Sequence, residues 1–126
     1  MPGTLTLDIR FGSVIVATSQ AIALNVTAQT NATWTLEWNL VARAVGSSTT
    51  ANVMHYAEWK SRASLNAPAV GTTNGVGTVL IPDTGMAVGT GFDSTAVQQV
   101  DLFATWQVSN ASNSITCNMY KLISDN

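Results

Sequence analysis

The segments that predict regular structure alternate apolar and polar residues with a period of two. In residues 5–11 the odd positions are apolar, and in residues 34–44 and 100–108 the even positions are apolar. Residues 115–123 alternate in the same way, with apolar odd positions except at Lys121. Successive side chains of a β-strand point to opposite faces of its sheet, so this pattern predicts half-buried strands and not helices.

Four weaker strands are also predicted, and turn-rich stretches separate the strands. The weaker strands lie at residues 13–18, 20–27, 52–61 and 77–82, and the turns lie at residues 46–50, 71–77 and 82–91. Gly, Asn, Asp and Ser dominate the turns, as turn backbones require. No segment of helical length is amphipathic. About eight short strands predict an all-β fold, an antiparallel two-sheet sandwich of the jelly-roll type.

The composition sets the size and the surface of this fold. A chain of 126 residues with 46% hydrophobic residues can supply one core, so residues 1–126 are expected to form a single domain. Only 10% of the residues are charged, against about 25% in average proteins. Copies with so few charges repel one another weakly, which favours a protein that works inside an assembly.

The charge and hydropathy patterns argue against nucleic acid and membrane partners. The five basic residues are scattered apart from Lys60 and Arg62, and the net charge is −2, so no basic stripe can face a series of phosphates. No apolar run approaches the ~18 residues of a membrane span, and no signal pattern opens the chain. The single cysteine, Cys117, predicts a buried thiol in a protein folded in a reducing cytosol.

Two residues could serve catalysis, and both have a simpler interpretation. Asp83 begins the Asp-Thr-Gly triplet of dimeric aspartic proteases, but Pro82 precedes it and the second signature of those enzymes is missing. A β-turn needs only the Asp and the Gly. His55 is the only histidine, and its strand places Val53, Ala57 and Trp59 on the same face. We therefore expect no enzymatic activity, no metal site and no cofactor.

The aromatic residues suggest both a core and a glycan contact. Trp34, Trp38 and Trp106 share strand faces with leucines and are expected in the core. Trp59 has charged residues on both sides in the sequence, so it is the candidate for an exposed ring that would stack on a sugar. A glycan-binding function depends on this residue.

Several apolar side chains fall on strand faces that should meet solvent. Phe103 shares a strand face with Asp101 and Thr105, opposite the predicted core face that carries Leu102 and Ala104. Tyr120 and Leu122 also point to the predicted solvent face of the last predicted strand. Val41 does the same on the strand at residues 34–44. Apolar residues on the outer face of a sheet with few charges predict a subunit or capsid interface. The simpler alternative is a set of scattered surface hydrophobes.

Several stretches resemble virion surface proteins of tailed bacteriophages. The resemblance rests on the strand QQVDLFATWQVS, the turn NASNS and the closing strand ITCNMYKL. The stretches WTLEWNLVARAVGSSTTANVMHYAEW and DSTAVQQVDLFATW are similar to the same proteins. The resemblance covers roughly residues 34–122 and implies a jelly-roll module, usually a trimer, on the phage head or on a fibre. The polar run at residues 109–114 is then a hairpin corner that needs no ligand.

This resemblance implies two alternative functions. The first is a head decoration or cement protein that forms a homotrimer, binds the major capsid protein and lies on the outer surface of the virion. The second is a fibre or receptor-binding module that recognises a host glycan through Trp59. The chain shows no N-terminal attachment segment or coiled-coil shaft, which favours the first function. In either case the protein is made in the cytoplasm of the bacterial host.

Overall fold

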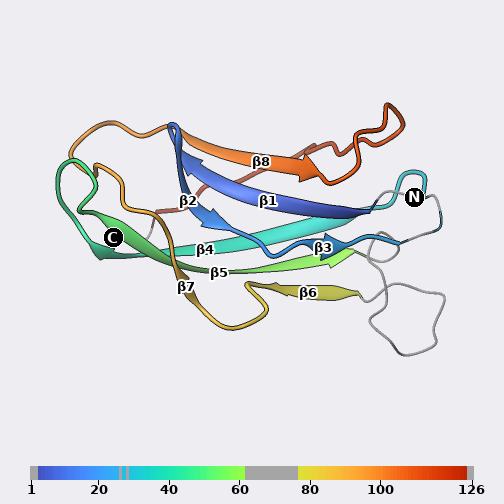
Figure 1. Cartoon of the computed structure of the whole chain (residues 1–126), viewed down its shortest axis with the longest axis horizontal. Coiled ribbons are helices and arrows are strands. Elements are labelled where there is room, and N and C mark those ends of the chain that lie inside the picture. Colours follow the sequence, from blue (N-terminus) through green and yellow to red (C-terminus); the bar gives the residue numbers. More distant parts are fainter. Residues whose placement is uncertain (1–2, 26, 28, 62–76, 125–126) are drawn as a thin grey trace.

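The computed structural model describes residues 3–25, 27, 29–61 and 77–124, and within them the chain forms eight β-strands and no helix. The strands are β1 (Thr4–Phe11), β2 (Val14–Thr18), β3 (Ile22–Ala23), β4 (Trp34–Ala44), β5 (Asn52–Ser61), β6 (Thr78–Ile81), β7 (Ala87–Val88) and β8 (Val100–Trp106). They form two four-stranded antiparallel sheets (Figure 1). The predicted all-β, two-sheet antiparallel sandwich is confirmed.

The first sheet is built around β1, with β8 on one side and β2 and β3 on the other. Leu7 and Ile9 of β1 are buried, as the alternation predicts. Residues directly opposite each other in an antiparallel pair share a face. Leu102 lies opposite Ile9 and Ala104 lies opposite Leu7, so the even positions of β8 face the interior of the sandwich.

The second sheet is built around β5, which pairs with β4 along one edge and with β6 and β7 along the other. The buried residues Val53, His55, Ala57 and Trp59 alternate along β5 and form its inner face. Leu36 of β4 lies opposite Trp59, so the even positions of β4 also point inward. The long pairing of β4 with β5 joins a strand with a clear alternating pattern to one that the sequence predicted more weakly.

The sandwich is closed along one side and open along the other. On the closed side β2 lies against β5 and β7, and the Gln20 side-chain amide donates a 2.8 Å hydrogen bond to the Leu80 carbonyl. Gly89 lies so close to the Val16 carbonyl that a β-carbon would not fit there. On the opposite side, within the part of the chain that the structure describes, β8 and β4 each pair with one strand, so both sheets end there in free edges.

Not every predicted element is present. The closing strand expected at residues 115–123 is not a strand within the described chain, so that prediction is wrong for the single copy. β7, in the turn-rich stretch at residues 82–91, was not predicted. The predicted turn at residues 71–77 lies outside the described residues except for Gly77. The described part of the chain has no helix that is long and apolar enough to cross a membrane.

Candidate functional site

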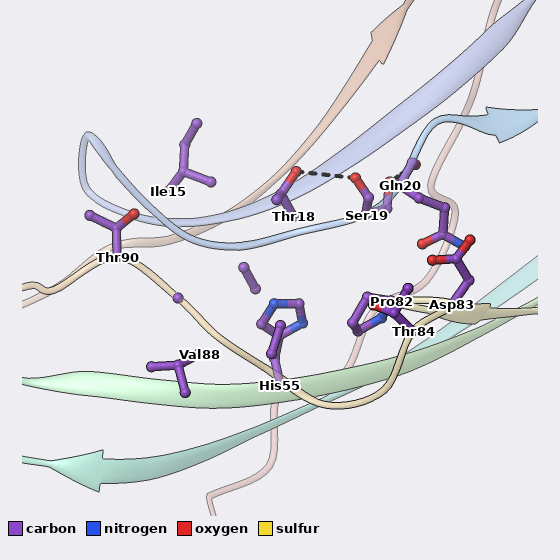
Figure 2. A pocket seen from close by; sticks show the side chains of 13 residues that line it. Ile15, Thr18, Ser19, Gln20, His55, Pro82, Asp83, Thr84, Val88 and Thr90 are labelled. Carbon is purple, nitrogen blue, oxygen red and sulfur yellow. Dashed lines mark hydrogen bonds between the residues drawn. The ribbon is translucent and has the colours of Figure 1, made fainter.

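A hollow of about 380 Å³ lies between β2, the central strand β5 and the connection that contains β7. Thr90 lies at one end and Asp83 at the other, with His55 between them (Figure 2). This hollow brings together the two residues that the sequence offered for catalysis. Its chemistry therefore depends on what His55, Asp83 and the nearby hydroxyl groups contact.

His55 is held as a buried, neutral acceptor. Its exposed fraction is 2%, and its Nδ1 accepts a hydrogen bond of 3.4 Å from Trp38 Nε1. The two rings also lie 5.7 Å apart, centroid to centroid. Burial lowers the pKa of His55 from its ordinary value of 6.5, because the interior disfavours the charged imidazolium. The contacts are those of a core histidine on the inner face of β5.

The Ser19 hydroxyl beside the hollow already takes part in structural hydrogen bonds, whereas the buried Gln20 Oε1 has no hydrogen-bond partner. The Ser19 hydroxyl accepts a hydrogen bond from the Leu7 amide at 2.9 Å and donates one to the Gln20 carbonyl at 2.7 Å. Asp83 is exposed in the turn between β6 and β7, which confirms the turn interpretation of the Asp-Thr-Gly triplet. Among the described residues no three metal-ligating side chains gather at one place. The hollow therefore offers a buried imidazole and a solvent-facing carboxylate that no hydrogen bond joins.

We expect the stability of the protein to depend on pH through His55. The unfolded chain binds a proton at this residue below about pH 6.5, whereas the folded state resists it. The free energy of unfolding should therefore be highest above pH 6.5 and fall as the pH is lowered towards the folded pKa, by at most about 1.4 kcal/mol per pH unit. Urea unfolding between pH 5 and 8 measures this slope. His55→Gln keeps an acceptor for Trp38, and its slope over this range should vanish; an unchanged slope would contradict the assignment.

The outward apolar residues predicted from the sequence are exposed but lie in three different places. Phe103 is 42% exposed on the outer face of the first sheet, and Val41 is 52% exposed on the outer face of the second. These two faces point away from each other, so the two residues do not share a patch. Tyr120 and Leu122, 90% and 70% exposed, belong to the segment after β8. The structure does not bring the predicted set together on one surface.

Phe103 belongs to a small polar and aromatic cluster on β1, β2 and β8. The Arg10 guanidinium lies 4.0 Å from the centroid of the Phe103 ring, a geometry that stabilises by about 0.5–1 kcal/mol at exposed sites. Arg10 also forms a salt bridge of 3.3 Å with Asp8, whose other oxygen accepts a 2.6 Å hydrogen bond from Thr18. The outer face of the first sheet therefore combines an exposed aromatic ring with charges that are already paired.

The inner face of β8 is the largest departure from the predicted core. Val100, Leu102 and Val108 were expected to be buried, yet they are 41%, 43% and 43% exposed. Leu102 faces inward by register, so its exposure shows that the interior is uncovered along this side. Ala104 and Trp106, further along the strand, do pack against the core. The sequence alone gave no sign of this difference, since all five residues share one alternating face.

The segment after β8 is the second departure. Cys117 was expected to be a buried thiol but is exposed, and Met119 and Ile123, placed on the buried face, are 91% and 63% exposed. Only Ile115 packs partly against the core. These residues are exposed because the segment pairs with neither sheet of its own chain. The alternation therefore did not predict which of its side chains would be buried.

Trp59, the predicted glycan contact, is buried with an exposed fraction of 2%. Its ring packs against Trp34 at a centroid distance of 5.4 Å. The charged neighbours Glu58 and Lys60 lie on the opposite face of β5, where they form a salt bridge of 2.8 Å. The prediction of an exposed ring is therefore wrong, because sequence neighbours on a strand point to opposite faces.

Comparison of the chain with protein-family models, with curated proteins and with solved structures finds no match. The resemblance to virion surface proteins stays a prediction.

Proposed function

We propose that this protein is a structural subunit of a phage particle, a jelly-roll decoration or cement protein that forms a homotrimer and binds the major capsid protein on the outer surface of the head. The observation that carries the proposal is the amount of apolar surface left open by a single copy. Exposed apolar residues occur on the inner face of β8, on the outer face of the first sheet and on residues 119–123. With only 10% charged residues, electrostatic repulsion between copies is weak, so these apolar surfaces can associate in solution.

Two further observations support an assembly role. The sandwich ends in free edges at β4 and β8, and an unpaired strand edge is a template for pairing with another chain. The charged groups next to Phe103 are already paired within the chain, which leaves the ring as the group available for a partner. The glycan-binding alternative loses the residue on which it depended, since Trp59 is buried.

Phe103→Asp is expected to convert the assembled protein into monomers. The new carboxylate would have to be desolvated in a subunit contact, whereas the monomer leaves this position 42% exposed and keeps Arg10 beside it. Light scattering during size-exclusion chromatography should give three times the 13.2 kDa chain mass for the wild type and one chain mass for the variant. Co-sedimentation with undecorated capsid shells should be lost in parallel.

The matched control is Thr84→Asp, which adds the same charge at an exposed turn position outside the proposed contact. It should remain trimeric and still bind capsid shells. A Phe103→Asp protein that assembles and binds shells like the wild type would remove Phe103 from the contact. A wild type that neither assembles nor binds shells would contradict the proposed function.

A further inference from the structure

The segment at residues 115–123 has the sequence alternation of a β-strand but pairs with no strand of the described chain. It follows β8 and runs back along the molecule to the opposite end, where the C-terminus lies (Figure 1). No backbone–backbone hydrogen bond joins it to another described residue. Within the described chain, its hydrogen bonding is limited to the Cys117 thiol, which donates to the Met119 carbonyl inside the segment itself. We call residues 115–123 the C-terminal arm.

The side chains of the C-terminal arm are unusually exposed for their chemistry. Met119 and Tyr120 are 91% and 90% exposed, and Leu122 and Ile123 are also on the surface. Apolar residues therefore occupy both faces of the arm near its end. A strand with apolar residues on both faces is typical of one that is covered on both sides. In the single copy neither side is covered.

The free edge of β4 is a matching acceptor for such a strand. β4 pairs with β5 over residues Trp34–Ala44, and no described residue pairs with its other edge. At eleven residues it is longer than the seven residues of β8, so β4 can pair with the whole arm. A strand added beyond β4 would extend the second sheet under β8. Its inward side chains would then cover Leu102 and Val100, the inner-face residues that the chain leaves exposed.

We propose that the C-terminal arm of one copy adds as a strand to the free β4 edge of a second copy. This inference rests on the proposed self-assembly and adds to it a second contact between copies, distinct from the one at Phe103. A second copy of this chain is enough to fill the β4 edge, because each copy carries one exposed C-terminal arm and one open β4 edge. The two surfaces differ, so the contact is heterologous, and repeating it around an axis closes a ring such as a trimer.

Proline substitutions in the arm test this pairing without disturbing the single copy. Adjacent amides of a strand point to opposite sides, so either Asn118 or Met119 must donate its N–H to the β4 edge. Proline has no N–H and cannot donate to a strand ladder. Neither amide has a partner within the described chain, and both residues are exposed. Asn118→Pro and Met119→Pro should therefore fold like the wild type, with unchanged circular dichroism.

One of the two proline variants is expected to elute as a monomer, with an association constant at least about tenfold weaker than that of the wild type. The matched controls Asn118→Ala and Met119→Ala keep the N–H and should remain assembled. Amide hydrogen exchange gives a second readout. Amides of the arm should be protected in the assembled wild type and should exchange freely in the proline variant that dissociates.

The outcomes separate the arm contact from the proposed function. If both proline variants assemble and the arm amides exchange freely in the wild type, arm exchange is overturned while self-assembly stands. A wild type that remains monomeric also overturns arm exchange, and binding of that monomer to capsid shells would leave the decoration function standing. Protection of the arm in the assembly, lost together with the assembly in one proline variant, supports the proposal.

Discussion

Replacing Trp59 with alanine should lower the free energy of unfolding by about 3 kcal/mol, the low end of the ~3–5 kcal/mol that a buried tryptophan contributes. The side chain is 2% exposed and lies in the main core cluster beside Trp34 and Leu36. Its loss leaves a cavity between the two sheets. The low end is expected because Trp59 Nε1 is buried with no hydrogen-bond partner, and the substitution removes that unfavourable group.

Urea unfolding followed by circular dichroism measures this change. Tyr56→Ala is the matched control, since Tyr56 lies on the same strand but is 47% exposed on the outer face. Tyr56→Ala should lower the free energy of unfolding by less than about 1.5 kcal/mol, roughly half of the loss expected for a buried aromatic residue. Trp59→Phe should cost no more than about 1.5 kcal/mol, because it keeps the ring volume in part and removes the unpaired N–H. Equal effects at Trp59 and Tyr56 would contradict the burial of Trp59.

The same variant has a consequence for glycan binding. A Trp59→Ala protein that fails to bind a sugar would do so through destabilisation of the core and not through the loss of an exposed stacking ring. Any glycan-binding measurement on this variant therefore needs the unfolding curve beside it. Trp59→Phe, which keeps an aromatic ring in the core, is the more informative variant for that measurement.

The alternation was sufficient to predict the strands that carry most of the fold. β1, β4, β5 and β8 lie where the period of two predicts them, and the buried odd positions of β5 follow the same rule. Trp59 could have been assigned correctly from this pattern. It shares a face with Val53 and Ala57, whereas its charged neighbours belong to the other face. Local sequence context was the weaker signal because adjacent strand residues meet different surroundings.

The remaining features depend on contacts that a periodic pattern does not contain. β7 has two residues, Ala87 and Val88, which is too short for alternation to be visible, and its position follows from pairing with β5. The alternation at residues 115–123 predicted a strand that is absent from the described chain, because alternation does not say whether a partner strand is available. Apolar residues on both faces at residues 119–123 are the feature on which the proposed pairing with a second copy rests, because one-sided burial would leave one face polar.

Leu102→Ala should cost about 2–3 kcal/mol of stability in the assembled protein and about 1 kcal/mol in the monomer. In a single copy the side chain faces inward but is 43% exposed, so truncation removes only about half of a buried leucine's contribution. In the proposed assembly the C-terminal arm of a second copy covers this position, and truncation leaves a closed cavity. The difference between the two costs measures the contact between Leu102 and the arm.

A double-mutant cycle isolates that contact. Leu102→Ala is measured in the wild-type background and in whichever proline variant dissociates, with thermal midpoints compared at one protein concentration because assembly makes them concentration-dependent. Leu7→Ala is the matched control, since Leu7 is 1% exposed in the single copy and its cost of about 2–5 kcal/mol should be the same in both backgrounds. Equal costs for Leu102→Ala in the two backgrounds would show that the arm does not cover β8. A larger cost in the assembly would link the exposed inner face, the free β4 edge and the unpaired arm, because one strand from a neighbouring copy accounts for all three.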